Sequence, residues 1–150
     1  MRDRSKSVKR ESDGTNVLFD VWLVSRATFG VLDAALAPSG LTADEFAIYS
    51  VLTGQDRVTP SELARWMTAP LTSMSSYIKR FEARGHISRI AHPDDGRSYQ
   101  IELTPAGRAA HRAAGKLFLP VLARVEVSLD RPAANVRDAL HSLHRALLTE

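Results

Sequence analysis

The sequence predicts a mainly α-helical fold that contains one short β hairpin. Apolar residues recur at helical spacing near both ends of the chain, which is typical of long amphipathic helices. Capping boxes at 42–45 and 59–62 mark the first turns of two shorter helices in the middle of the chain. Apolar and polar residues alternate over 99–103, which favours a half-buried strand, and the Asp-Gly pair at 95–96 favours a hairpin turn before it.

Composition limits the possible functions. The chain has 150 residues, 44% of them hydrophobic, which is enough for one domain with a real core. No apolar run approaches the roughly 18 residues that span a bilayer, and the charged N-terminus lacks the apolar segment of a secretory signal. The absence of cysteine excludes disulfides, thiol catalysis and cysteine zinc sites. We therefore expect a cytoplasmic protein with no cofactor, no metal and no membrane contact. The net charge of +3 and the pI near 9.6 permit nucleic-acid binding.

The N-terminal part divides into a tail and a helix. Residues 1–15 alternate charged side chains with Ser and Gly, which predicts a disordered basic tail, or alternatively a basic arm that contacts phosphates. Residues 16–38 predict a long helix that ends at Pro38-Ser39-Gly40. Its apolar residues fall on more than one face, so a second burial partner is needed, and we expect another subunit.

The segment 41–104 predicts three short helices and two strands. The first two helices begin at the capping boxes, and Pro60 takes the favoured first helical position of the second. The third is expected from about Pro70, capped by Thr68, to Gly85. Strands at 86–91 and 99–103 then follow, with Arg97 at the tip of the hairpin. This is the order of elements in a winged helix-turn-helix, which places one helix in the major groove of DNA.

The third helix carries the candidate DNA-reading residues. Its inner face is expected to hold Leu71, Met74, Ile78 and Phe81. Its outer face and flanks hold short hydroxyl side chains and two cations: Thr72, Ser73, Ser75, Ser76, Lys79 and Arg80. Hydroxyls can bond base edges or phosphates, and cations at phosphates release counterions. Arg97 would suit a narrow minor groove. The alternative is an ordinary solvated helix face.

Residues 105–150 predict two helices that share the apolar character of residues 16–38. Thr104 and Pro105 begin a long helix to about residue 129, in which Pro120 should cause a kink or a break. The last helix carries an apolar stripe at 4-3-4 spacing: Val136, Leu140, Leu143 and Leu147. We expect 16–38 and 105–150 to form a dimerisation domain; alternatively, they pack only within one subunit.

Four short motifs in this order resemble the MarR family of bacterial transcriptional regulators. They are Ser61-Glu-Leu-Ala64, Phe81-Glu-Ala-Arg-Gly85, His92-Pro-Asp-Asp-Gly-Arg97 and Leu103-Thr-Pro-Ala-Gly107. Phe81 replaces the Leu that usually begins the second motif, and Asp95-Gly-Arg97 supplies the Asp-x-Arg of the family's wing. The outer face of the third helix departs from the family, whose members often carry more basic residues there.

The resemblance implies a homodimer with one winged helix per subunit that binds double-stranded DNA at a pseudo-palindromic operator. It also implies that Asp95 holds Arg97 or caps the wing turn. Many members are repressors that small aromatic anions release, and possible lining residues of such a pocket are Trp22, Phe29, Tyr49 and His111. Each of these four can instead be simple core or surface.

Other functions fit the sequence poorly. It has no Gly-rich phosphate loop, no thiol and no serine in a nucleophile elbow, so we expect no enzyme. His141 and His144 lack a nearby carboxylate pattern that would complete a metal site. The main alternative is a winged helix that contacts proteins and has lost DNA binding, because the outer face of the third helix is weakly charged.

Overall fold

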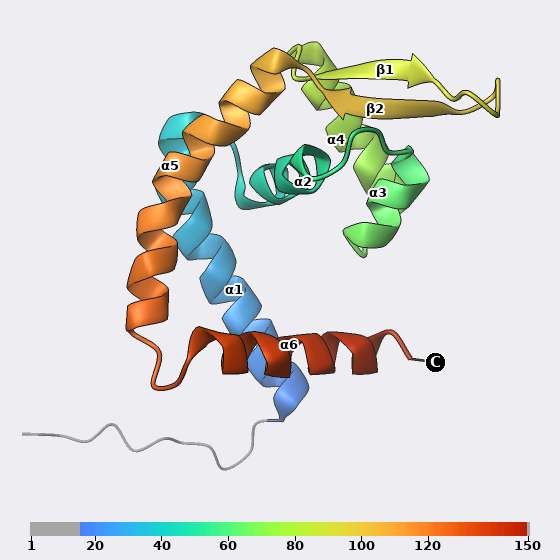
Figure 1. Cartoon of the computed structure of the whole chain (residues 1–150). Helices are drawn as coiled ribbons and strands as arrows, with labels where there is room; N and C mark the ends of the chain where they lie inside the picture. The colour runs from blue at the N-terminus through green and yellow to red at the C-terminus, as the bar shows by residue number, and fades with distance from the viewer. Residues whose placement is uncertain (1–15, 150) are drawn as a thin grey trace, which may run out of the picture.

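The computed structural model describes residues 16–149 and shows a mainly helical chain with one two-stranded sheet (Figure 1). The tail predicted for residues 1–15 lies outside this range. The elements in chain order are α1 (Val17–Leu36), the 3-10 turn η1 (Ala37–Ser39), α2 (Ala43–Thr53), α3 (Pro60–Trp66), α4 (Leu71–Ala83), β1 (Ile87–Ala91), β2 (Tyr99–Leu103), α5 (Pro105–Val127) and α6 (Ala133–Leu147). The predicted helices and hairpin are confirmed. Among residues 16–149, no helix is both long enough and apolar enough to cross a bilayer.

The elements form two groups. Helices α1 and α5 lie side by side, and α6 crosses the N-terminal part of α1 (Figure 1). Helices α2, α3 and α4 gather with the hairpin at the other end of the α1–α5 pair, from which the hairpin projects. The winged helix-turn-helix is therefore held on a helical base made by the two ends of the chain.

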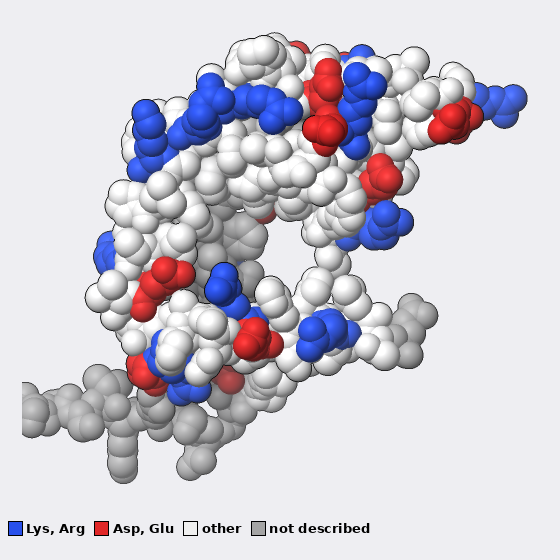
Figure 2. All heavy atoms as spheres, viewed as in Figure 1, with Lys and Arg blue, Asp and Glu red and all other residues white. Residues whose placement is uncertain are grey.

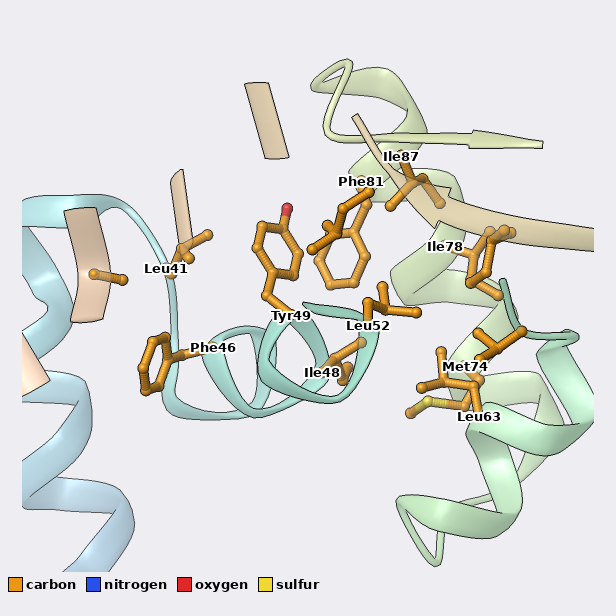
Figure 3. Close-up of a cluster of buried hydrophobic side chains, with 14 of the residues drawn as sticks. Leu41, Phe46, Ile48, Tyr49, Leu52, Leu63, Met74, Ile78, Phe81 and Ile87 are labelled. Carbon is orange, nitrogen blue, oxygen red and sulfur yellow. The ribbon is translucent and has the colours of Figure 1, made fainter. Parts of the chain in front are cut away.

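The hydrophobic core lies mainly within the segment 41–104. Tyr49 of α2 meets Phe81 of α4 edge to face, with ring centroids 4.7 Å apart (Figure 3), and the strand residue Ile101 is also fully buried. Full burial of one large apolar side chain, such as Phe81 or Ile101, stabilises the folded chain by about 1.5–3 kcal/mol. Other core residues from the same segment are Leu41, Phe46, Ile48, Leu52, Val58, Leu63, Met74, Ile78, Ile87 and Leu103. This packing fixes α4 against α2 and the sheet.

Both predicted capping boxes are present. The Thr42 hydroxyl accepts a hydrogen bond from the Glu45 amide, and the Glu45 carboxylate accepts one from the Thr42 amide, each at 3.2 Å. Thr59 and Glu62 make the same pair at the start of α3, at 3.2 Å and 2.8 Å. Each box satisfies two amides that a helix N-terminus otherwise leaves unpaired.

The start of α4 differs from the prediction. Helix α4 begins at Leu71 without a side-chain cap, and Thr68 does not cap it. Thr68 instead ends α3: it takes the left-handed conformation, with φ 49°, and the next amide, of Ala69, bonds the Ala64 carbonyl at 2.9 Å. This is the Schellman arrangement, which satisfies the last carbonyls of a helix. Thr68 therefore belongs to the C-terminal turn of α3 and does not serve as the N-cap of α4.

The hairpin is antiparallel, and Ile87 pairs with Leu103 at its base. The Asp95-Gly96 turn is confirmed, because the Asp95 carbonyl accepts from the Ser98 amide at 3.1 Å. That turn lies within a longer connection, residues 92–98, rather than joining the strands directly. The wing therefore ends in an exposed loop that carries Arg97 beyond the sheet.

Helix α5 is continuous through Pro120, so of the predicted kink or break, the break is wrong. Pro120 lies on the exposed side of the helix, where the carbonyl that loses its amide donor can face water instead. At the other end of α5, the Thr104 hydroxyl accepts from the Gly107 amide at 3.1 Å and donates to the Gly85 carbonyl at 2.6 Å. Thr104 thus ties the start of α5 to the end of the α4 segment.

Candidate nucleic-acid interface

Helix α4 presents one face to the core and the opposite face to solvent. Met74, Ile78 and Phe81 are buried, as predicted, and give the helix its orientation. Gly85 follows the helix with φ 71°, a left-handed conformation that glycine adopts without strain, and turns the chain toward β1. Packing of the inner face of α4 therefore sets the direction in which the outer face points, and contacts of the outer-face residues do not.

The outer face carries the predicted hydroxyl residues. Thr72, Ser73 and Ser76 are exposed and Ser75 is half-buried. The Ser76 hydroxyl donates to the Thr72 carbonyl at 3.2 Å, which leaves its lone pairs and the other hydroxyls available to a ligand. Lys79 is exposed, and none of the ion pairs described for residues 16–149 includes it. Its charge is therefore available to a phosphate.

Leu71 does not join the inner face of α4, and this part of the prediction is wrong. As the first residue of the helix it lies beyond the edge of the core, with 48% of its surface exposed. Leu71 lines a hollow between the starts of α3 and α4 and the wing, together with Ser61, Ser75 and Arg97. Hydroxyl, apolar and cationic groups thus meet where the helix-turn-helix adjoins the wing.

Arg80 has a different environment from its neighbour Lys79. Its Nη1 donates to Oε1 of Glu45 at 3.2 Å, and its guanidinium lies over the Tyr77 ring, 4.9 Å from the centroid. Arg84, at the C-cap of α4, donates to the same oxygen at 3.1 Å. Two of the cations of the α4 segment are therefore paired inside the protein.

The wing tip combines Asp95 with Arg97. Oδ1 of Asp95 accepts from the backbone amide of Arg97 at 3.0 Å, so Asp95 caps the turn. Both side chains are exposed, and basic and acidic side chains meet at the tip of the wing (Figure 2). The Arg97 guanidinium extends from a turn whose shape the neighbouring carboxylate fixes.

The four residues predicted to line a ligand pocket do not come together. Trp22 and Phe29 are 57% and 42% exposed on α1, whereas Tyr49 is fully buried in the core. His111 of α5 stacks on Phe46 with centroids 5.2 Å apart. A separate groove of about 370 Å³ lies between α1 and α5, and its lining is apolar except for one threonine: Val24, Ala27, Thr28, Val31, Leu32, Phe118, Val121, Leu122 and Val125.

Two histidines contact hydroxyl groups, and burial favours the neutral form of each ring. Nδ1 of His86 lies 2.8 Å from the Tyr49 hydroxyl, and burial, followed by the charge of Arg84, lowers the pKa of His86. His111 contacts the hydroxyls of Ser50 and Thr53 at 3.0 and 3.2 Å, and burial likewise lowers its pKa. Burial also raises the pKa of the Tyr49 phenol. These contacts join α2 to the residue before β1 and to α5.

Glu45 has a second role, beyond the capping box, that was not predicted from the sequence. A helical wheel of α2 gives a signal, because Glu45 shares a face with Ile48, Tyr49 and Leu52, all of which are buried. An acidic residue on such a face requires a cationic partner. The identity of that partner, 35 residues away in the chain, has no local signal.

Comparison with known proteins places this geometry in a family. Residues 41–99 match the MarR family profile. The HTH-type transcriptional repressor Rv2887 of Mycobacterium tuberculosis is 33% identical over 101 residues, which cover 67% of this chain and 73% of the repressor. The multiple antibiotic resistance protein MarR of Salmonella typhimurium is 27% identical over 89 residues, which cover 59% and 62% of the two chains.

Solved structures agree. The M. tuberculosis transcriptional regulator MosR, in a complex with DNA, has a TM-score of 0.79 and 29% identity, with 89% of this chain and 96% of MosR covered. Wild-type MarR from E. coli has the same fold, with a TM-score of 0.71 over 90% of this chain and 98% of that one at 22% identity. The chain belongs to the MarR family of transcriptional regulators.

Proposed function

We propose that the protein is a repressor that binds operator DNA by placing α4 in the major groove and the wing beside the adjacent minor groove. The observation that carries this proposal is the outer face of α4, which lies next to the Arg97-bearing wing. This face carries exposed hydroxyls and Lys79, which takes part in none of the ion pairs found among residues 16–149. The DNA complex of MosR and the name of the repressor Rv2887 support the same function.

The exposed groups make different contacts with DNA. The hydroxyls of Thr72, Ser73, Ser75 and Ser76 can bond base edges or phosphates, which sets register and reads sequence permissively. Lys79 supplies a phosphate contact whose strength falls as salt rises. Arg97 reaches a minor groove, where the negative potential is greatest when the groove is narrow.

We propose that the DNA-binding form is a homodimer. Apart from Trp66 and Leu71, the most exposed large apolar side chains of residues 16–149 lie on α1, the second half of α5, and α6 with its C-cap. An apolar surface of this extent is typical of a protein interface. Two copies would present two α4 helices to half-sites about one helical turn apart. A sedimentation experiment at micromolar concentration should give a dimer, and a monomer would contradict this part of the proposal.

A small aromatic effector remains part of the proposed function. The α1–α5 groove is apolar and its lining includes no cationic residue, so it suits an uncharged ring and offers no partner to a carboxylate. Neutral and anionic aromatic compounds should therefore be compared as inhibitors of DNA binding. Release by the neutral compounds supports this site, and release by the anions alone contradicts it.

The alternative, a winged helix that only contacts proteins, is not favoured. Three of the four hydroxyl residues and Lys79 are exposed on α4, and relatives with this fold include a regulator solved on DNA. Among the described residues around α4, the exposed large apolar side chains are Trp66 and Leu71, which is less than the extended apolar patch that marks many protein interfaces.

Selection from random duplex DNA tests the proposal. A sequence with two related half-sites should be enriched, and its affinity should fall log-linearly with salt. Lys79→Ala should flatten that slope by about 0.9. Lys116→Ala is the matched control, because it removes the same charge from an exposed position on α5 and should leave the slope unchanged. Failure to enrich any sequence, or equal slopes for the two variants, would contradict the proposal.

A further inference from the structure

Glu45 is the one charged residue that is buried among residues 16–149, with 1% of its surface exposed. It lies in the first turn of α2, against the core residues that orient α4. A buried carboxylate is costly unless charged and hydrogen-bonded partners surround it. The partners of Glu45 therefore show what this residue is used for.

The two carboxylate oxygens have separate tasks. Oε2 accepts from the Thr42 amide at 3.2 Å and completes the cap of α2. Oε1 accepts from Nη1 of Arg80 and from Nη2 of Arg84, at 3.2 and 3.1 Å. Both arginines belong to the last turn of α4 and its C-cap. The Glu45 carboxylate thus holds the two cations at the C-terminal end of α4 against α2.

Arg80 would otherwise be available to DNA. It lies one residue from Lys79 on the border of the outer face, and 51% of its side chain is exposed. Its guanidinium points back to Glu45 and rests on the Tyr77 ring. Because half of the side chain is already in solvent, a guanidinium released from Glu45 can extend outward instead of remaining buried.

We propose that Glu45 is a positioning residue that limits the affinity and the salt dependence of DNA binding, because it holds the charge of Arg80 away from the DNA backbone. This inference rests on the proposed function. With Arg80 paired, binding depends on the hydroxyls of α4, on Lys79 and on Arg97. A free Arg80 adds a phosphate contact that is the same on every sequence, so it strengthens binding to operator and non-operator duplexes alike and makes both more sensitive to salt.

The test is Glu45→Gln, which keeps the shape of the side chain and an oxygen for the Thr42 amide but removes the charge. Affinity for a non-operator duplex should rise, and its salt slope should steepen by about 0.9. The ratio of affinities at about 50 and about 200 mM salt should then grow by roughly 3.5-fold. Operator affinity should rise by the same factor, so the ratio of operator to non-operator affinity should stay near the wild-type value.

Asp44→Asn is the matched control. Asp44 precedes Glu45 on α2 and accepts a hydrogen bond from the Tyr77 hydroxyl at 3.0 Å, not from an arginine. Its substitution changes the net charge by the same amount one residue away. It should leave the salt slope near the wild-type value. Equal slopes for Glu45→Gln and Asp44→Asn would show a general charge effect and would overturn the proposal.

Arg80→Ala completes the experiment and also tests the proposal if Glu45→Gln does not fold. Glu45 keeps Arg84 as a partner in this variant, and the salt slope should equal that of the wild type, in contrast to Lys79→Ala. In the double variant Glu45→Gln, Arg80→Ala, the steepening should disappear. A slope that flattens in Arg80→Ala as much as in Lys79→Ala would overturn the proposal, because Arg80 would then already contact DNA in the wild type.

The outcomes also separate this inference from the proposed function. If the wild type shows no salt-sensitive binding to any duplex, the proposed function itself fails. If the wild type binds its operator and Lys79→Ala flattens the slope while Glu45→Gln equals the wild type, only the role of Glu45 fails. Thermal unfolding of each variant should be followed by circular dichroism, so that affinities are compared for folded protein.

Discussion

The carboxylate of Asp95 accepts a hydrogen bond from the backbone amide of Arg97, at 3.0 Å, across the tip of the wing. A side chain that bonds an amide two residues later forms an Asx turn and needs only an acceptor oxygen, not a charge. The acidic residue next to the proposed DNA contact thus has a conformational role. Its negative charge alone would oppose DNA binding.

Asparagine and alanine at position 95 should therefore have different effects on operator affinity. Asp95→Asn keeps the acceptor and removes the charge, so operator affinity should equal or exceed that of the wild type. Asp95→Ala removes both, and operator affinity should fall because the turn that carries Arg97 is no longer fixed. Fluorescence anisotropy with a labelled operator measures both. A loss in Asp95→Asn as large as that in Asp95→Ala would refute the role of Asp95 as a turn cap.

Arg97 itself should contribute one specific contact. Arg97→Ala should weaken operator binding by roughly 1–3 kcal/mol, the range for a single good base contact. The side chain is exposed at the wing tip, so the variant should unfold at the same temperature as the wild type. Wild-type affinity in the same assay would exclude the wing from the interface.

Two glycines of α5 provide a test of the scaffold. A Cβ on Gly107 would lie 2.9 Å from the carbonyl carbon of His86 and 2.9 Å from Cδ2 of Leu103, which is too close. Gly107→Ala should lower the free energy of unfolding by about 1–3 kcal/mol, the usual cost of overpacking. A Cβ on Gly115 meets nothing within 4 Å, so Gly115→Ala should raise it by up to about 1 kcal/mol through helix propensity. Urea unfolding of both variants measures the difference, and equal effects would contradict the close packing of α5 on the His86 backbone.

Stability should fall as the pH drops below about 6.5, the ordinary pKa of histidine. Burial, followed by the charge of Arg112, lowers the pKa of His111 in the folded chain. Between the folded and unfolded pKa values, the unfolded chain binds a proton that the folded chain does not, so acid favours unfolding. His86 acts in the same direction. Each group contributes at most about 1.4 kcal/mol per pH unit within this window.

His111→Gln isolates one of these groups. Glutamine can still bond the hydroxyls of Ser50 and Thr53 but does not titrate. Between pH 7.5 and about pH 5.5, the free energy of unfolding should decrease less in the variant than in the wild type. The same pH dependence in both proteins would show that His111 remains protonatable in the folded state.

Local signals in the sequence predicted most of the fold. The capping boxes that begin at Thr42 and Thr59 each span only four residues, and both are present. The alternation over 99–103 likewise predicted β2. Such features were predictable because the interacting groups are neighbours in the chain, so spacing alone identifies them.

Features that depend on tertiary contacts were not predictable in the same way. The ion pair of Arg80 with Glu45 was not predicted, because Glu45 lies on another helix. Leu71 has the spacing of an inner-face residue, yet it is exposed because the core ends before the first turn of α4. Thr68 has the residue type of an N-cap, but the chain reverses there to close α3. Aromatic character alone also could not show that Tyr49 belongs to the core.

The most direct test of the central claim is wild-type binding to the selected operator and to a shuffled duplex of the same composition, measured over a series of salt concentrations. The operator should be bound at least about 10³-fold more tightly than the shuffled duplex at physiological salt. Both affinities should fall log-linearly as salt rises. Equal affinity for the two duplexes, or affinity that does not change with salt, would contradict sequence-specific binding through α4 and the wing.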